Sequence, residues 1–423
     1  MSKSNYEKYK ELKTLFDFEY RGFNMGQLMG SEIAGQVYSL ERFSVVPSIK
    51  NSLKYFDLSS FMNEINSKNI ITYTYDRDDY LELCYSYISQ LRLKEYKLKI
   101  IPKKMGKVTI NLVHIYKSLV FFFKLKDLEF KIKINLLSYL ITSKNTIDAL
   151  LKSTIHLPEN YYSFNSSDGV ETFITLYYKQ KGVNTYSFQH GMYFNFLEPI
   201  PVDVINFENF VADKMLCWGR YSVDEMRKFG INKSRLILFG NPKYNQINPY
   251  SRSNTTFKRC LVSLSRRQYN EGNYKLLKIV QSIKSDIVFD IKLHPSLDIT
   301  EYKNKVPSDK NVTLLESSEL LSDLFLKDYD FIITYNTTAH YEGLVSGHLT
   351  FGYGYQNDGA ILFEEFNNMD KLEDLLIKYN DENELLIDNR IKKFIKYIFK
   401  IEKKIIAPNN LAQRSKIYYF ERS

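Results

Sequence analysis

The alternation of apolar and polar residues is most regular between residues 160 and 190. Apolar residues recur at helical spacing within Val170–Gln180, and Gly182 follows as a natural helix stop. Short runs typical of strands, Tyr161–Phe164 and Asn184–Phe188, stand on either side of this helix. The order strand, helix, strand predicts a βαβ unit with two parallel strands.

The same alternation continues along the chain. Further strands are predicted at Lys214–Trp218, Leu236–Phe239, Cys260–Leu264, Ile287–Leu293, Val312–Leu315, Tyr329–Thr334 and His348–Gly352, and further helices at Ser222–Phe229, Asn273–Ser285, Ser318–Leu326 and Ala339–Ser346. Between the two series lies the polar segment Lys243–Lys258, which is typical of a domain linker. Alternating strands and helices predict parallel sheets with helices on both faces. We therefore expect an α/β protein of two Rossmann-like domains that face each other across a cleft.

The first 150 residues show a weaker pattern. Residues 1–50 favour helices with a bend at Gly22–Gly30, and residues 51–150 are mixed and rich in lysine. We predict a first domain over residues 1–245, with a lysine-rich insertion around residues 92–133. A second domain is predicted over residues 255–390, followed by a basic amphipathic helix and tail over residues 391–423.

Length and charge narrow the classes of protein. A chain of 423 residues is long enough for two domains. The net charge is +9, and the segment Arg92–Lys133 alone holds twelve basic and three acidic residues. Such a segment attracts phosphates, anionic lipid or nucleic acid. No pattern of a known nucleic-acid-binding motif accompanies it, so we expect no nucleic-acid partner.

The cysteines and the apolar segments bear on cofactors and location. Cys84, Cys217 and Cys260 are far apart and form no CxxC pair, which argues against disulfides and a zinc site. We expect no metal and no other cofactor. The N-terminus has no apolar core typical of a signal peptide, and the longest apolar cluster, around Leu119–Phe123, is far shorter than the ~20 residues that span a bilayer. We expect a cytoplasmic protein.

In the first domain, unusual residues follow the ends of two predicted strands. These are Asp168 with Gly169, and Gln189, His190 and Gly191. Ligands of open parallel sheets bind beyond the carboxyl ends of the strands. A carboxylate and an imidazole there suit general acid–base chemistry on a hydroxyl, and the glycines permit tight turns and close approach of a ligand. The alternatives are a helix-capping Asp168 and a His190 bonded to the backbone.

In the second domain, polar residues also follow strand ends. The candidates are His294, Pro295, Asn336, Thr337, Thr338, Arg266 and Glu342. An imidazole N–H, hydroxyls at a helix start and an arginine can all bind phosphate. Glu342 could accept hydrogen bonds from a ribose. The alternatives are a turn histidine, capping threonines, a solvated basic turn at Arg266 and Arg267, and a solvent-facing Glu342.

In order and spacing these residues resemble bacterial GT-B glycosyltransferases of surface and capsular polysaccharide synthesis. His294-Pro295 followed by Asn336-Thr337-Thr338 is similar to the HP and Ser/Thr-pair motifs of sialyl- and polysialyltransferases. Gln189-His190-Gly191 and the GNPKY at Gly240–Tyr244 are similar to segments of Kdo transferases and teichoic-acid glycerophosphotransferases. The resemblance covers about residues 160–355.

The resemblance implies a cytidine nucleotide donor and a metal-independent transfer. The donor would be a CMP-sugar, such as CMP-sialic acid or CMP-Kdo, with its phosphate contacted by His294, Thr337 and Thr338. The acceptor would be a hydroxyl of a glycan or lipid-linked glycan, at the inner face of the plasma membrane. The resemblance to polysialyltransferases implies Asp168 as the general base, whereas the resemblance to glycerophosphotransferases implies His190. Both residues are therefore candidates for the base. The alternatives are a CDP-polyol phosphotransferase and non-enzymatic binding of nucleic acid or a sugar nucleotide.

Two basic segments bear on membrane contact. Lysine and phenylalanine interleave in Lys117–Lys133, and the stretch Ile391–Ile406 is predicted to form a basic amphipathic helix. Such segments can lie on anionic lipid. Alternatively, the C-terminal helix packs on the protein and leaves its lysines in solvent.

Overall fold

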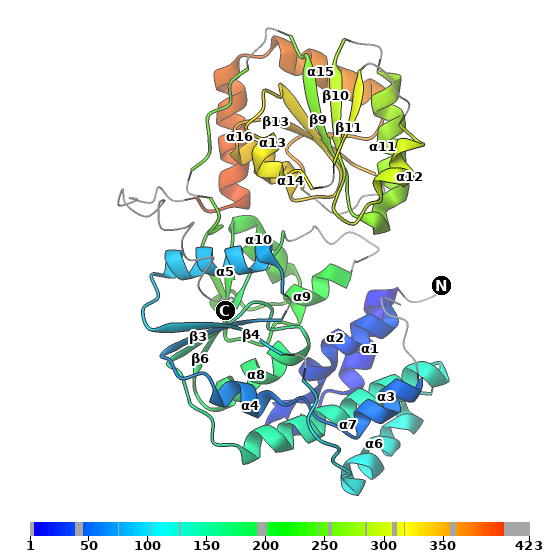
Figure 1. Cartoon of the computed structure of the whole chain (residues 1–423), viewed down its shortest axis with the longest axis vertical. Coiled ribbons are helices and arrows are strands. Elements are labelled where there is room, and N and C mark those ends of the chain that lie inside the picture. Colours follow the sequence, from blue (N-terminus) through cyan, green and yellow to red (C-terminus); the bar gives the residue numbers. More distant parts are fainter. Residues whose placement is uncertain are drawn as a thin grey trace.

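The fold is described from a computed structural model of the chain. The description covers residues 4–38, 45–74, 76–102, 104–126, 128–192, 200, 202–244, 246–252, 256–283, 286–306, 311–316, 318–355 and 361–401. Two lobes, each built around one parallel sheet, follow one another along the chain (Figure 1). Within the described residues, no helix is both long and apolar enough to span a bilayer.

The first sheet has six strands in the order β4-β3-β5-β6-β7-β8, and every neighbouring pair is parallel. The strands are β3 (Asn69–Tyr73), β4 (Tyr96–Ile100), β5 (Asn160–Ser163), β6 (Asn184–Phe188), β7 (Lys214–Cys217) and β8 (Leu236–Leu238). The predicted βαβ unit is β5, α8 (Gly169–Gln180) and β6. Its strands and helix lie where the hydrophobic pattern puts them.

The second sheet also has six parallel strands, in the order β11-β10-β9-β12-β13-β14. The strands are β9 (Arg259–Ser263), β10 (Val288–Lys292), β11 (Val312–Leu315), β12 (Phe331–Thr334), β13 (Leu349–Tyr353) and β14 (Glu365–Phe366). Counted along the chain, this is the 3-2-1-4-5-6 order of the Rossmann fold. The predicted α/β class with two Rossmann-like domains is confirmed.

Helices cover both faces of the first sheet. On one face, α5 (Asp78–Leu91) and α10 (Arg220–Lys228) pack on residues such as Ile71 and Tyr162. On the other face, Ile70 and Tyr161 point into a second core. The helices of that core include α1 (Asn5–Leu15), α2 (Met25–Val37), α4 (Leu58–Asn63), α7 (Phe130–Lys152), α8 and α9 (Ile205–Glu208). Alternate residues of one strand therefore serve two cores, as expected for a sheet buried on both sides.

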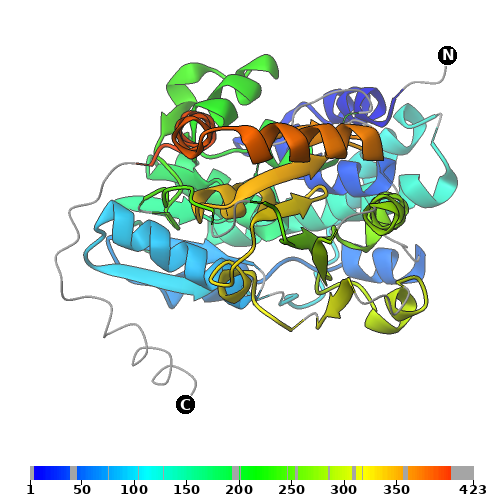
Figure 2. The same ribbon diagram turned by 90° about the horizontal axis from the view of Figure 1, so that it is seen from above.

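In the second domain, α13 (Leu321–Leu324) shares a core with Leu261 and Ile332 on one face of the sheet. On the other face, Phe351 contacts Tyr379 of α15 (Met369–Asp381). The remaining helices are α11 (Asn270–Ser282), α12 (Ile299–Lys303), α14 (Ala339–Val345) and α16 (Glu384–Ile398). Viewed from above, the second domain lies in front of the first (Figure 2).

The structure orders the region that the pattern leaves open. β3, α5 and β4 extend the first sheet, and α3 (Val45–Ser52), α6 (Leu112–Lys124) and α7 form a helical layer beside it (Figure 1). The expected bend at Gly22–Gly30 is only a turn at Arg21 and Gly22 between β1 (Glu19–Tyr20) and β2 (Phe23–Asn24). The other two glycines of that stretch lie inside α2.

The predicted C-terminal helix begins earlier than its pattern suggests. α16 starts at Glu384, so the boundary drawn at residues 390 and 391 falls inside it, and residues 402–423 lie outside the described part of the chain. Ile391, Ile395 and Ile398 are fully buried. The apolar face of this helix therefore packs on the protein, as in the second of the two alternatives.

The end of α16 returns the chain to the first domain. α16 lies against α10, and the backbone N–H of Lys400 donates to the carbonyl oxygen of Trp218 at 2.7 Å. A Cβ atom on Gly219 would lie only 1.8 Å from the carbonyl oxygen of Ile398. Only a residue without a side chain allows the two backbones to come this close.

Replacing Gly219 by alanine is therefore expected to destabilise the junction. The added methyl group meets backbone rather than a movable side chain, so we expect Gly219→Ala to lower the free energy of unfolding by about 1–3 kcal/mol. Gly35→Ala is the matched control, because a Cβ atom there meets nothing within 4 Å inside α2. Urea denaturation of both variants measures the difference, and equal stability would contradict the contact.

Candidate active site between the two domains

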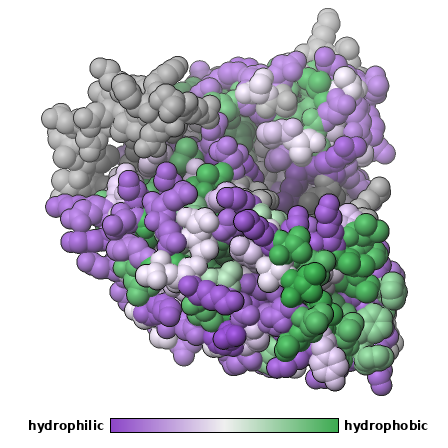
Figure 3. Space-filling model, turned by 60° about the horizontal axis from the view of Figure 1, so that its bottom comes forward, coloured by the Kyte–Doolittle hydropathy of each residue, from purple (hydrophilic) through white to green (hydrophobic). Residues whose placement is uncertain are grey.

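The candidate residues lie at carboxyl ends of strands, beside the point where strand order reverses in each sheet. In the second sheet this point lies between β9 and β12, and in the first between β3 and β5. Open parallel sheets bind ligands at such points. The molecular surface is hollowed along the boundary between the two domains (Figure 3). This is the GT-B arrangement.

His294 directly follows β10 and is half-buried. The backbone N–H of Ser296 donates to its Nδ1 atom at 3.1 Å, and the Ser296 Oγ atom lies 2.9 Å from the same nitrogen. Because Nδ1 accepts a hydrogen bond, the neutral ring carries its proton on Nε2. The loop therefore holds this histidine as a hydrogen-bond donor.

Positive charge from both domains acts on His294. Burial lowers the pKa of His294, and the charges of Arg266, Lys292 and Arg77 lower it further, in that order. Arg266 and Lys292 belong to the second domain, whereas Arg77 precedes α5 in the first. Three cations close to a neutral N–H donor form a site suited to an anion such as phosphate.

Hydrogen bonds join the three loops that carry the second-domain candidates. The hydroxyl of Ser265 donates to the carbonyl oxygen of Asn336 at 3.0 Å, and the N–H of Arg267 donates to the hydroxyl of Ser296 at 3.2 Å. Asn336 has a positive φ of 42°, a conformation that asparagine tolerates better than most residues. The ends of β9, β10 and β12 thus form one connected surface.

The two threonines have different surroundings. The Thr337 hydroxyl accepts from the N–H of Ala339 at 3.3 Å, at the start of α14, whose N-cap residue is Thr338. Thr338 is exposed. Its hydroxyl and that of Tyr244 donate to the carboxylate of Glu342, whose pKa is raised by burial. Glu342 therefore joins the linker to the second domain and does not simply face solvent.

In the first domain, Asp168 precedes α8 and is half-buried. Its side chain makes no capping hydrogen bond, so the capping alternative does not account for it. Gly169 has a positive φ of 45°, and no atom lies within 4 Å of where a Cβ would stand. The turn predicted for this glycine is therefore present, and the carboxylate of Asp168 does not cap the helix.

His190 and Gln189 differ in exposure. The half-buried His190 ring lies 5.2 Å from the ring of Phe164 and 6.1 Å from that of Phe207, nearly parallel to the latter. Gln189 is fully buried, accepts from the N–H of Trp218 at 2.7 Å and donates to the carbonyl oxygen of Gly191 at 3.0 Å. Gln189 therefore braces the turn that carries His190, and its side chain is not exposed to a ligand.

Arg77 and Tyr80, which the sequence pattern does not single out, connect the two walls. The Tyr80 ring stacks on Phe164 at 4.3 Å, and the Arg77 guanidinium lies 4.2 Å from the centre of the Tyr80 ring. Burial raises the pKa of Tyr80, and the charges of Asp79 and Asp168 raise it further, whereas those of Arg77 and Arg266 lower it. Tyr80 is thus within electrostatic reach of both the first-domain carboxylate and the second-domain arginine. The signal in the sequence is the RDDY that opens α5 after the buried strand β3.

Glu171 is a further residue that the pattern does not reveal. Its carboxyl group is 1% exposed and accepts from the hydroxyls of Ser163 and Thr74 and from the N–H of Asn165. Burial raises its pKa to about 8 despite these donors. Glu171 therefore fastens the ends of β3 and β5 to the helix that follows Asp168.

The sequence has no match among protein families, and no curated protein matches it significantly. Among solved structures, the S. aureus MnaA–UDP complex shares 13% identity, covering 78% of this chain and 92% of that one, with a TM-score of 0.46. The wall teichoic acid polymerase TagF, in a variant form soaked with CDPG, shares 14% identity, covering 89% of this chain and 93% of that one, with a TM-score of 0.42. The glycotransferase of kitacinnamycin shares 11% identity, covering 82% of this chain and 98% of that one, with a TM-score of 0.47.

Glu171 makes the stability of the first domain depend on pH. Because its folded pKa is raised above the unfolded value, the stability it provides is complete below pH ~4.5 and is lost as pH rises through about 8. We expect the wild-type free energy of unfolding to fall by roughly 1.4 kcal/mol per pH unit between pH 6 and 8, relative to Glu171→Gln. Chemical denaturation at pH 6, 7 and 8 measures this. Exposed Glu64→Gln is the control, and parallel curves for all three proteins would contradict the assignment.

Proposed function

We propose that this chain is a GT-B glycosyltransferase that moves a sugar from a CMP-sugar to a hydroxyl of a surface-glycan acceptor. The observation that carries the proposal is that charges of both domains act on one site: Asp168 and Arg266 on Tyr80 of the first domain, and Arg77 and Arg266 on His294 of the second. A carboxylate on one wall and a cluster of phosphate-binding groups on the other are the two chemistries that such a transfer needs.

The donor phosphate binds at the second domain. His294 donates its Nε2–H to a phosphate oxygen, while Arg266, Lys292 and Arg77 neutralise the charge. The exposed residue Thr338 and the turn at Asn336 border the same surface. As the bond between the anomeric carbon and the phosphate oxygen breaks, CMP leaves with the electron pair. These fixed donors stabilise that charge, so the reaction needs no metal.

The acceptor hydroxyl binds at the first domain. Its oxygen forms the new bond to the anomeric carbon, and its proton passes to a base on this wall. Asp168 and His190 are the two candidates, because each follows a strand end of the same βαβ unit. A glycan or lipid-linked glycan would present this hydroxyl, and domain closure would exclude competing water.

A second candidate, transfer of a phosphopolyol from a CDP-linked donor, is favoured by one observation. The charges of three cations act on His294, and a diphosphate carries more negative charge than the single phosphodiester of a CMP-sugar. In that reaction the acceptor oxygen attacks phosphorus, the pyrophosphate bond breaks and CMP is again the leaving group. The same residues would serve both reactions.

Nucleotide binding tests the function. We expect cytidine nucleotides to raise the melting temperature more than UDP or GDP, because binding at 100 times Kd stabilises the folded state by about 2.7 kcal/mol. A larger shift with CDP than with CMP would favour the phosphopolyol donor. His294→Ala should abolish both the shift and transfer without unfolding the protein, since His294 lies in a loop.

The exposed His156→Ala is the matched control for His294→Ala and should behave as the wild type. Equal shifts with all four nucleotides would contradict a cytidine donor. A His294→Ala variant with normal transfer would remove His294 from the site.

Paired variants identify the base. Asp168→Asn and His190→Gln each remove one candidate, and the true base should cost ~10²–10⁴ in turnover while donor binding is retained. The donor-induced thermal shift reports binding in each variant. If both variants turn over within tenfold of the wild type, the base is neither residue.

A further inference from the structure

Helix α6 presents its most apolar side to solvent. Six residues at spacings of one, three or four form a stripe along it, and each is about half exposed or more: Leu112, Val113, Tyr116, Leu119, Val120 and Phe123. Leu112, Tyr116 and Phe123 are 74%, 72% and 72% exposed. We call these six residues the α6 stripe. Scattered exposed apolar residues are ordinary, but a continuous stripe usually marks an interaction surface.

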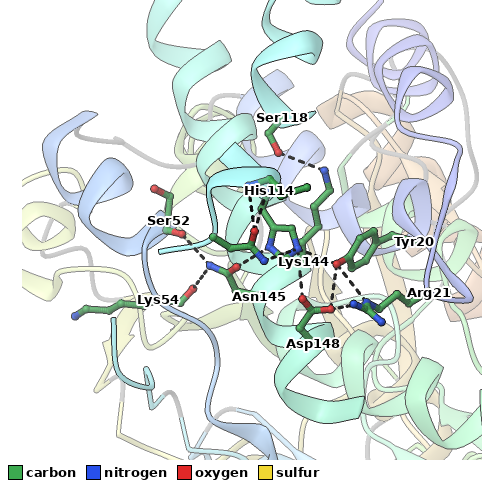
Figure 4. Close-up of polar contacts among 11 residues, drawn as sticks. Tyr20, Arg21, Ser52, Lys54, His114, Ser118, Lys144, Asn145 and Asp148 are labelled. Carbon is green, nitrogen blue, oxygen red and sulfur yellow. Dashed lines mark hydrogen bonds and ion pairs between the residues drawn. The ribbon is translucent and has the colours of Figure 1, made fainter. Parts of the chain in front are cut away.

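The inward side of α6 is held by polar contacts. His114 is 5% exposed and Ser118 is fully buried. The Nε2 atom of His114 lies 2.8 Å from the Tyr20 hydroxyl and 3.3 Å from the Asp148 carboxylate, and its Nδ1 atom lies 2.8 Å from the amide oxygen of Asn145 (Figure 4). The hydrogen-bonded groups come from β1, α6 and α7.

A buried lysine completes this polar anchor. Lys144 of α7 is 2% exposed and donates to the Ser118 hydroxyl at 3.3 Å (Figure 4). Burial, and then nearby Lys117, lowers the pKa of Lys144 to about 8. At the end of α6, Phe121 also packs on Phe16 and Phe18. Turning α6 over would leave these polar groups without partners, so the outward direction of the α6 stripe is fixed.

Lysines border the α6 stripe. Lys117 and Lys124 lie on α6 itself and are exposed, and Lys124 and the exposed Lys126 line a shallow groove together with the aromatic rings of Tyr116 and Phe123. The segment Arg92–Lys133, with twelve basic and three acidic residues, has a net charge of +9. The space-filling view shows hydrophobic surface mixed with hydrophilic residues on this side of the first domain (Figure 3). Apolar residues beside lysines are complementary to a bilayer whose headgroups are anionic.

We propose that the α6 stripe docks on the surface of an anionic lipid bilayer. Its apolar residues enter the boundary between headgroups and acyl chains, and the bordering lysines bind headgroup phosphates. A second copy of the chain is a poorer occupant, because a symmetric contact would place the same lysines against each other. The proposal does not depend on the reaction in the cleft.

Vesicle flotation tests the docking surface. Wild-type full-length protein is mixed with vesicles of phosphatidylglycerol and phosphatidylcholine, and separately with phosphatidylcholine alone. We expect flotation with the anionic vesicles and about tenfold less partitioning onto neutral ones. Leu112→Ser with Phe123→Ser should lower partitioning on anionic vesicles at least about tenfold, because two side chains that insert are lost.

The second domain offers a matched control. Leu326 and Ile377 are 87% and 64% exposed, so Leu326→Ser with Ile377→Ser removes similar apolar surface elsewhere. This control should float as the wild type does. Circular dichroism and light scattering establish that each variant is folded and give its oligomeric state.

Three results would overturn the proposal. These are a wild type that does not float, an equal loss of flotation in the control variant, or a wild-type dimer that becomes monomeric only in the α6 variant while vesicle binding is unchanged. Because no donor or acceptor is used, a failure here leaves the transferase proposal untouched, and the reverse also holds.

Discussion

The relation between the two domains depends on the close backbone contact at Gly219. There the chain leaving α16 returns to the first domain, and Lys400 is hydrogen-bonded to Trp218. Trp218 in turn donates to Gln189, the residue that braces the turn carrying His190. Two hydrogen bonds therefore connect this junction to Gln189, the residue that precedes the candidate base His190. The placement of the second domain and the geometry of the first-domain wall are therefore linked.

The charges of the cleft are divided between its walls. Cations and a neutral histidine donor gather on the second domain, and the carboxylate of Asp168 stands on the first. Arg77 is the exception, since it comes from the first domain and reaches the cluster around His294. It is held by Asp79 at 2.6 Å and by the ring of Tyr80. Because Arg77 adds a first-domain charge to the second-domain cluster, an anionic ligand bound there would interact with both domains and hold them together.

Local pattern was enough to predict most of both sheets, but it could not predict this cleft. β5, α8 and β6 are buried segments whose periodicity is clear, and they are where the pattern placed them. β4 is an edge strand of largely exposed residues, Tyr-Lys-Leu-Lys-Ile, so its sequence lacks the run of apolar residues that marks a buried strand. Arg77 and His294 are 217 positions apart, and only the folded arrangement brings them together. For α6, periodicity shows that one face is apolar but not which face the rest of the protein will cover.

The polar anchor of α6 has a consequence for the surroundings in which the helix can remain attached. A helix held by apolar packing alone can be solubilised by lipid, since acyl chains are as good a solvent for leucine as the protein interior. Hydrogen bonds behave in the opposite way, because they strengthen as the local dielectric constant falls. The bonds among His114, Asp148 and Tyr20 would therefore tighten when water is displaced around them. A hydrocarbon environment that loosens ordinary surface helices would hold this one more firmly in place.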